Sequence, residues 1–176
     1  MTIVVLTGMM GTGKTSVGER LAKALGATFV DTDAMVERAE GRSVAAIFAS
    51  HGEAAFRAAE KRAIGEALAV PRAVVATGGG AIVDAENRKT LQSAAPIVCL
   101  TARPDVILAR AAAAGATRPL LQDADPAARL AALLAERAAA YAQADLTIDT
   151  SARGVDDVVG EVLAFLRRRG GTDVPS

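Results

Sequence analysis

The chain has 176 residues, which suits one compact domain with a sizeable core, and half of them (51%) are apolar although no tryptophan is present. Its 20 basic and 20 acidic residues cancel, which argues against the broad basic field of a nucleic-acid-binding protein. No apolar run is long enough for a membrane span, and the single cysteine, Cys99, excludes an intrachain disulfide framework.

These limits predict a cytoplasmic protein that acts on small molecules. The one cysteine fits a reducing compartment, and no secretory signal is recognised before the first apolar run. We expect no nucleic-acid partner and no membrane partner. We expect a monomer, although a surface without net charge also permits a dimer.

Short apolar runs alternate with helical patterns along the chain. We expect strands at 2–7, 28–31, 73–77, 97–101 and 146–149. We expect helices at about 14–25, 33–40, 44–50, 53–69, 85–94, 104–113, 127–143 and 155–168. This alternation predicts an α/β fold in which helices cover both faces of a parallel sheet.

Residues 1–169 show neither an internal repeat nor a linker, so we expect a single domain. Residues 41–69 form an extra helical insertion between the second and third strands. The stretch 111–126 contains Gly115 and Pro119 and is longer than most loops of compact domains, which makes it a candidate lid. The tail 170–176 is expected to fray.

The first strand runs into Gly8-Met-Met-Gly-Thr-Gly-Lys-Thr15, and a helical pattern follows directly. A strand, a glycine turn and a helix in this order predict a phosphate-binding loop, because glycines let backbone N–H groups turn toward phosphate oxygens. Lys14 would reach the β- and γ-phosphates, and the Thr15 hydroxyl would ligate Mg²⁺. The alternative is a glycine-rich turn with a solvated lysine.

The second strand ends in Asp31-Thr-Asp33, whose two carboxylates project to one side of an extended backbone. One could support Mg²⁺, and the other could accept a proton from a substrate hydroxyl, as phosphoryl transfer requires. The alternative is that one of them only caps the helix that follows. Because the carboxyl ends of parallel strands share one rim, this pair should lie near the loop.

The third strand ends in Gly78-Gly79-Gly80, which suits a ligand that touches backbone N–H groups, although a plain flexible turn is the alternative. Arg137 falls on the apolar stripe of its predicted helix, so it should meet an anionic ligand, pair with an internal carboxylate or reach solvent. Arg57 stands at helical neighbour spacing from Glu53 and Glu60, a pattern that an ordinary ion-pair ladder would also produce.

Arg118 lies in the candidate lid. A mobile arginine that closes over a triphosphate would stabilise the charge of the transition state. A solvated loop arginine is the alternative. His51 stands at a predicted helix end and receives no catalytic role. No cysteine–histidine metal site is present in the sequence.

Together these motifs resemble the shikimate kinase family over nearly the whole chain. The resemblance is carried by GMMGTGKT at 8–15, DTD at 31–33, GEAAFRAAE at 52–60, TGGGA at 77–81, RPLL at 118–121, and ER with a later Y at 136–141. The loop by itself is generic, whereas the ordered set is specific. Nucleoside monophosphate kinases usually carry one more glycine between the loop lysine and threonine, and this chain does not.

The resemblance implies a three-layer P-loop fold of the nucleoside-monophosphate-kinase type, with a five-stranded parallel sheet. It implies a helical substrate-binding insertion at about 32–69 and a lid at about 111–126. The implied reaction moves the γ-phosphoryl group of ATP, with Mg²⁺, to the 3-hydroxyl of shikimate. The products would be shikimate 3-phosphate and ADP, in chorismate and aromatic amino acid biosynthesis.

By position, the resemblance also implies residue roles. Thr15 and Asp31 would be associated with Mg²⁺, and Asp33 would bind the reacting hydroxyls and act as base. Further substrate contacts would come from Arg57, Arg137, the amides of Gly78, Gly79 and Gly80, and the rings of Phe48 and Phe56. Nucleotide contacts would come from Gly8, Gly11, Thr12, Gly13, Lys14, Thr15, Ser16 and the lid residue Arg118, with Lys14 and Arg118 also catalytic.

The lid departs from the family pattern, because its first half is Ala111-Ala-Ala-Ala-Gly-Ala-Thr117 where charged residues are common. Arg110 stands eight residues before Arg118, where seven is expected, so Arg110 and Arg153 are only candidates for adenine contacts. A less polar lid would weaken nucleotide affinity or alter closure without changing the reaction. A kinase for another hydroxy acid such as gluconate and a non-catalytic nucleotide-binding module stay open as alternatives.

Overall fold

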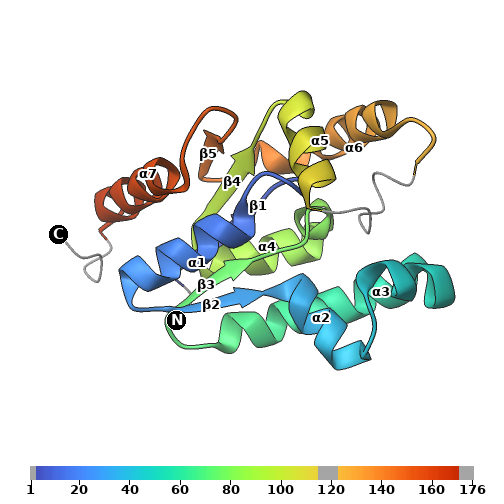
Figure 1. Cartoon of the computed structure of the whole chain (residues 1–176). Coiled ribbons are helices and arrows are strands. Elements are labelled where there is room, and N and C mark those ends of the chain that lie inside the picture. The colour runs from blue at the N-terminus through green and yellow to red at the C-terminus, as the bar shows by residue number, and fades with distance from the viewer. Residues whose placement is uncertain (1–2, 115–122, 171–176) are drawn as a thin grey trace.

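The computed structural model describes residues 3–114 and 123–170 (Figure 1). Within these ranges five strands form one sheet: β1 (Val4–Thr7), β2 (Thr28–Asp31), β3 (Ala73–Ala76), β4 (Ile97–Thr101) and β5 (Leu146–Asp149). All pairings are parallel, and the strand order is β2-β3-β1-β4-β5. The predicted five-stranded parallel sheet is therefore confirmed.

β1 lies at the centre of the sheet, where its four residues are all buried. Such a strand has helices on both faces, so it has a continuous apolar run and no polar alternation. In register, Leu6 and Asp31 both pair with Ala76 of β3. The carboxyl ends of β1, β2 and β3 therefore meet at one rim, as predicted.

The helices of the described residues agree closely with the sequence pattern. They are α1 (Lys14–Leu25), α2 (Thr32–Glu40), α3 (Val44–Ala69), the 3₁₀ turn η1 (Ala81–Val83), α4 (Ala85–Ala94), α5 (Pro104–Ala113), α6 (Pro126–Tyr141) and α7 (Val155–Arg168). α3 contains the predicted break, because Gly52 (φ 79°, ψ 174°) is non-helical inside it. α6 stops before the predicted residue 143, because the N–H groups of Gln143 and Ala144 turn back to carbonyls three residues earlier.

Two apolar layers hold the helices on the sheet. On one face α1 and α7 pack against alternate strand residues such as Val4 and Leu6. On the other face α3, α4 and the end of α6 pack against the intervening residues, among them Val5 and Cys99. Figure 1 shows α2 and α3 extending together beyond the sheet, where Phe56 and Val36 form a smaller apolar cluster.

Residues 115–122, half of the predicted lid, lie outside the described residues, as do 171–176 of the predicted tail. Among the helices that are described, none combines the length and the apolarity that a membrane crossing requires.

Candidate active site

The loop that follows β1 has the tight geometry expected of a phosphate-binding turn. Gly8 has φ 131°, and a Cβ at this position would lie 2.1 Å from the Leu100 carbonyl oxygen, so only glycine fits. The Thr12 side chain is buried and its hydroxyl donates to the Met9 carbonyl at 2.7 Å, which closes the turn. The loop backbone is therefore held in one shape by its own residues.

α1 begins directly at Lys14, with the left-handed Gly13 as its N-cap. No acidic residue stands in the first turn and no side chain caps it, so its N–H groups and partial positive charge remain available to an anion. The Lys14 ammonium group donates to the carbonyls of Gly8 (2.8 Å) and Met9 (3.0 Å). This places a cation directly over the loop.

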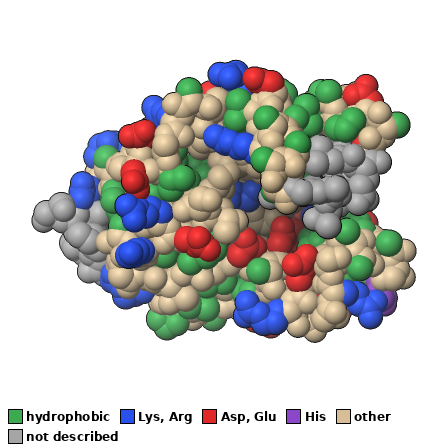
Figure 2. All heavy atoms as spheres, in the orientation of Figure 1, with side chains coloured by type: hydrophobic (Ala, Val, Ile, Leu, Met, Phe, Trp, Pro, Cys, Tyr) green, Lys and Arg blue, Asp and Glu red, His purple; other side chains and the backbone are tan. Residues whose placement is uncertain are grey.

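A cavity of about 320 Å³ opens where the loop meets the end of β2. Its walls include Lys14, Thr15, Ser16, Asp31, Asp33 and Arg110. The structure thus brings the predicted triphosphate residues and the predicted carboxylate pair to one hollow. Figure 2 shows the face of the molecule drawn in Figure 1, with acidic side chains (red) gathered across its middle.

Asp31 both caps α2 and lines the cavity. Its Oδ1 accepts from the backbone N–H groups of Asp33 (3.0 Å) and Ala34 (3.2 Å). The capping alternative is thus correct for one oxygen of this carboxylate. Asp33 makes no such cap and turns to the interior, where its Oδ1 has no hydrogen-bond partner among the described residues.

Asp33 is in an environment that opposes ionisation. Burial raises the pKa of its carboxyl to about 6, and the negative charges of Asp31 and Glu60 act in the same direction. Lys14 opposes them by favouring the charged form. A carboxylate whose pKa lies close to the working pH is suited to general base catalysis.

Two guanidinium groups converge on the glycine turn after β3. A Cβ at Gly79 would lie 2.8 Å from Arg137 Nη1, and one at Gly80 would lie 2.9 Å from Arg57 Nη2. Any larger residue would displace the end of an arginine side chain, so glycine lets both guanidinium groups approach the turn closely. Arg57 comes from α3 and Arg137 from α6, and both had been predicted to clamp a carboxylate.

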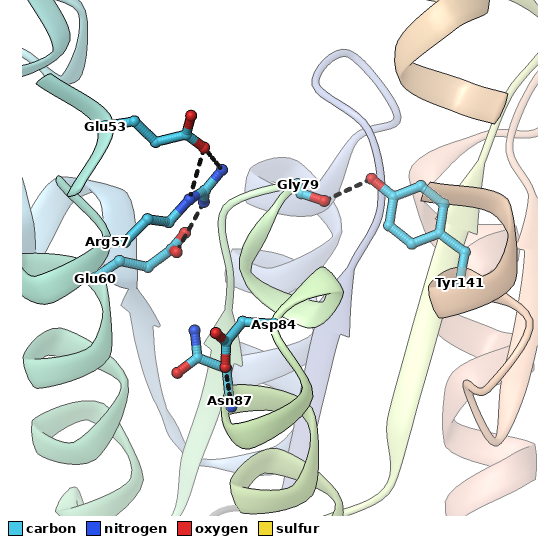
Figure 3. A network of polar contacts seen from close by, with 7 residues as sticks. All are labelled: Glu53, Arg57, Glu60, Gly79, Asp84, Asn87 and Tyr141. Carbon is cyan, nitrogen blue, oxygen red and sulfur yellow. Dashed lines mark hydrogen bonds and ion pairs between the residues drawn. The ribbon is translucent and has the colours of Figure 1, made fainter. Parts of the chain in front are cut away.

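Arg57 also makes the ion pairs that the alternative reading predicted. It binds Glu53 at 3.2 Å and Glu60 at 2.9 Å, and Figure 3 shows its side chain held between them. The two acids differ greatly, because the Glu53 side chain is 67% exposed and that of Glu60 only 1%. Burial raises the pKa of Glu60, while the Arg57 hydrogen bond and charge oppose this rise.

Glu60 is a site residue that sequence reasoning treated only as a surface partner of Arg57. A Cβ at Gly78 would lie 2.6 Å from Asp33 Oδ1 and 3.1 Å from Glu60 Oε1, so these two oxygens, which have no hydrogen-bond partner among the described residues, both lie close to Gly78. The signal was available, since Glu60 falls four residues from both Phe56 and Ile64 on the buried stripe of α3. A carboxylate on such a stripe needs a partner or a ligand.

α6 delivers Arg137 and Tyr141 to the same turn. Arg137 Nη1 donates to the Met9 sulfur at 3.4 Å, and its Nε has no partner among the described residues. Tyr141, four residues later, donates its hydroxyl to the Gly79 carbonyl at 2.7 Å, as Figure 3 shows. The chain's one tyrosine thereby fixes the turn that Arg137 faces.

The other predicted residues lie in different surroundings. The Phe48 ring is 38% exposed and packs on the buried Phe56 ring at a centroid distance of 4.7 Å, and the Arg57 guanidinium lies over Phe56. Arg153 forms an ion pair with Glu161 of α7. Arg118 lies outside the described residues.

The site consists of two sides. We call Gly8–Ser16 with Arg110 and Thr150 the phosphate-loop side, and Asp33, Arg57, Glu60, Gly78–Gly80 and Arg137 the glycine-turn side. Thr150 had not been predicted; it follows β5, is buried and contacts both Thr12 and Arg110. Its only sequence signal was its place at the carboxyl end of a strand.

The oxygen donors present suit Mg²⁺ better than a metal whose ligands all come from the protein. Thr15 and Asp31 both line the cavity, and among the described residues no cluster of three or more His, Cys, Asp or Glu could hold a metal. Mg²⁺ usually keeps several waters and takes only one or two protein ligands beside phosphate oxygens. These residues therefore fit it.

Comparison with known proteins gives one consistent family. The protein-family profile described as "Shikimate kinase" matches residues 10–167. The chain is 46% identical to a shikimate kinase of Geobacter metallireducens over 94% of this chain and 92% of that one. It is 46% identical to a shikimate kinase of Symbiobacterium thermophilum over 95% of this chain and 97% of that one.

The fold agrees with solved structures of the same family. The structure of a shikimate kinase from Acinetobacter baumannii in complex with shikimate superposes with a TM-score of 0.89 at 36% identity. That match covers 94% of this chain and 93% of the other. The chain therefore belongs to the shikimate kinase family.

Proposed function

We propose that this protein is an active shikimate kinase, transferring the γ-phosphoryl group of ATP to the 3-hydroxyl of shikimate. The observation that carries the proposal is the convergence of Arg57 and Arg137 on Gly79 and Gly80, opposite a phosphate loop that shares a cavity with Asp33. A small hydroxylated carboxylate fits this arrangement. Two guanidinium groups can hold its carboxylate while Asp33 meets its hydroxyls.

On the phosphate-loop side, the residues position the nucleotide. The backbone N–H groups at the start of α1 and the Lys14 ammonium would hold the β- and γ-phosphates. Thr15 and Asp31 would hold Mg²⁺, which when bound supplies charge neutralisation between the phosphates. Arg118, in the predicted lid, is proposed to contact the phosphoryl group that is transferred.

On the glycine-turn side, Asp33 would accept the proton of the attacking hydroxyl. Its raised pKa means that both protonation states are accessible near neutral pH, so the carboxylate can take up a proton without great cost. Arg57, Arg137 and the backbone amides of Gly78–Gly80 would orient the ring of shikimate. The rings of Phe48 and Phe56 would limit the space on the α3 side.

The remaining proposals concern domain organisation, cellular location, oligomeric state and partners. We propose a single domain over 1–169, a cytoplasmic location and a monomeric state, with neither nucleic acid nor membrane as partner. The one cysteine, Cys99, is buried and its pKa is raised to about 11 by burial, so it is an unreactive core residue. Light scattering of the purified protein measures its mass in solution and so tests whether it is a monomer.

The test of function is a coupled assay of ADP release with shikimate, gluconate and other hydroxy acids as acceptors, each at several concentrations, with and without Mg²⁺. We expect the highest kcat/KM with shikimate and a requirement for Mg²⁺. A higher kcat/KM with another acid would reassign the substrate. If no acceptor stimulates ADP release, the protein would be a nucleotide-binding module and not a kinase for these acids.

A further inference from the structure

Thr150 connects three parts of the molecule through one buried hydroxyl. Its side chain is only 3% exposed, at the turn between β5 and α7. Its Oγ1 lies 2.9 Å from the Thr12 carbonyl oxygen and 3.1 Å from the Thr101 carbonyl oxygen. The same atom accepts a hydrogen bond from Arg110 Nη1 at 3.0 Å. One hydroxyl proton serves two carbonyls, so both sides of this oxygen are occupied.

Arg110 is held from the other direction. Its Nη1 also donates to the Gly11 carbonyl at 3.1 Å, and its Nη2 donates to the Thr150 carbonyl at 2.8 Å. All of these acceptors are uncharged, and no carboxylate pairs with Arg110 in the described part of the chain. The cavity that Lys14 lines is therefore also lined by a second cation, fixed by neutral oxygens.

The contact with Thr12 sets the orientation of a loop peptide. A trans peptide places its C=O and N–H on opposite sides. Holding the Thr12 carbonyl against Thr150 consequently turns the Gly13 N–H away from Thr150, and Gly13 lines the cavity. The Gly11 carbonyl, one residue earlier, is held by Arg110 in the same way.

We propose that Thr150 is a positioning residue for the nucleotide, acting through the Thr12–Gly13 peptide and through the Arg110 guanidinium. The proposal rests on the proposed function in so far as a nucleotide occupies the phosphate-loop side. No Thr150 contact reaches the glycine-turn side, so its loss should change nucleotide binding and leave acceptor binding unaffected.

The test compares Thr150→Val, which keeps the shape and removes the hydroxyl, with Thr150→Ser, which keeps the hydroxyl. The matched control is Thr101→Val, because the Thr101 hydroxyl lies at the neighbouring strand end and donates only to the Ile148 carbonyl. For each variant the Kd of a fluorescent ADP analogue is measured by titration, and KM values for ATP and shikimate are measured by ADP release.

For Thr150→Val we expect the Kd for the ADP analogue and the KM for ATP to rise by roughly tenfold, as leaving buried hydrogen-bonding groups unpaired implies. The KM for shikimate should stay within about twofold. Thr150→Ser should restore the nucleotide constants to within roughly threefold of the parent protein, and Thr101→Val should not change them.

An unchanged Kd in a folded Thr150→Val protein would overturn the proposal, as would equal losses for ATP and shikimate. If Thr150→Val does not fold, the same titration of Thr150→Ala decides. The Kd measurement needs no turnover, so it still tests Thr150 if shikimate proves not to be the acceptor. Failure of the proposed function would appear instead in the acceptor panel.

Discussion

The two sides of the site bind their charged groups in different ways. On the phosphate-loop side, Lys14 and Arg110 donate to backbone carbonyls of the loop, which are neutral. On the glycine-turn side, charged groups face one another: Arg57 pairs with Glu60, and Asp33 experiences the negative charges of Asp31 and Glu60. The loop Gly8–Ser16 on the first side is a local structure, to which Arg110 and Thr150 are added from distant segments, whereas the second side is an assembly of side chains from α2, α3 and α6 around the glycine turn.

The difference also appears in the hydrogen bonds that are made. Five buried side-chain atoms lack partners among the described residues. Three of them, Asp33 Oδ1, Glu60 Oε1 and Arg137 Nε, lie on the glycine-turn side, and the other two are the hydroxyls of Thr7 and Thr32. Buried polar atoms are nearly always paired, so unpaired ones mark where a polar ligand is needed. On the phosphate-loop side the backbone N–H groups at the start of α1 remain available to an anion, whereas the glycine-turn side needs the acceptor to complete side-chain hydrogen bonds.

The largest expected effect separates catalysis from nucleotide binding. Asp33→Asn removes the proposed base but keeps the size of the side chain, so turnover should fall by roughly 10²–10⁴-fold. The Kd for ADP should change by less than about twofold, because Lys14 and the loop are untouched. Steady-state assays and nucleotide titrations measure both. Near-normal turnover would mean that another group takes the proton.

The next effect tests the clamp. Arg137→Lys keeps the charge and loses the planar fork, so the KM for shikimate should rise by roughly 10–100-fold while the KM for ATP stays constant. The matched control is Arg20→Lys, since Arg20 forms an exposed ion pair with Asp156. A parallel rise of both KM values would show that the two sides are not separate.

A smaller effect distinguishes the two acids that bind Arg57. Glu60→Gln should raise the KM for shikimate by roughly tenfold, because the buried partner fixes the guanidinium where Gly80 lies. Glu53→Gln removes a mostly exposed pair and should change it by less than about twofold. Equal effects of the two substitutions would contradict the importance of burial.

The last effect is on stability and depends on pH. The folded-state pKa of Asp33, about 6, exceeds the ordinary value of 3.8, so its ionisation opposes folding as pH rises through this window. Asp33→Asn should therefore increase the free energy of unfolding at pH 8 by about 1–3 kcal/mol and lose this advantage near pH 4. Denaturant melts at both pH values measure it. A pH-independent difference would refute the assigned environment.

The sequence predicted the loop Gly8–Ser16 well because its residues are contiguous. The strand that precedes Gly8 and the helix that begins at Lys14 are where the pattern indicated, and even the break at Gly52 was expected. Propensity and periodicity are local quantities, and they were sufficient here.

The glycine-turn side could be predicted only in part. Arg57, Arg137 and Gly78–Gly80 were identified as candidates, but which of them meet depends on the packing of α3 and α6 against the sheet. The burial of Glu60 was signalled by its place on the apolar stripe of α3 but was not used. The hydrogen bonds of Thr150 depend on contacts between distant segments, for which one sequence carries little signal. Capping and a place at the cavity had been weighed as alternatives for Asp31, but this residue both caps α2 and lines the cavity.

The most direct test of the account is the initial rate of ADP release from ATP and Mg²⁺ with shikimate present and absent. The account predicts that shikimate accelerates release by orders of magnitude, saturably, and that one shikimate 3-phosphate forms for each ADP. A rate that shikimate does not change, in protein that binds ADP normally, would contradict it.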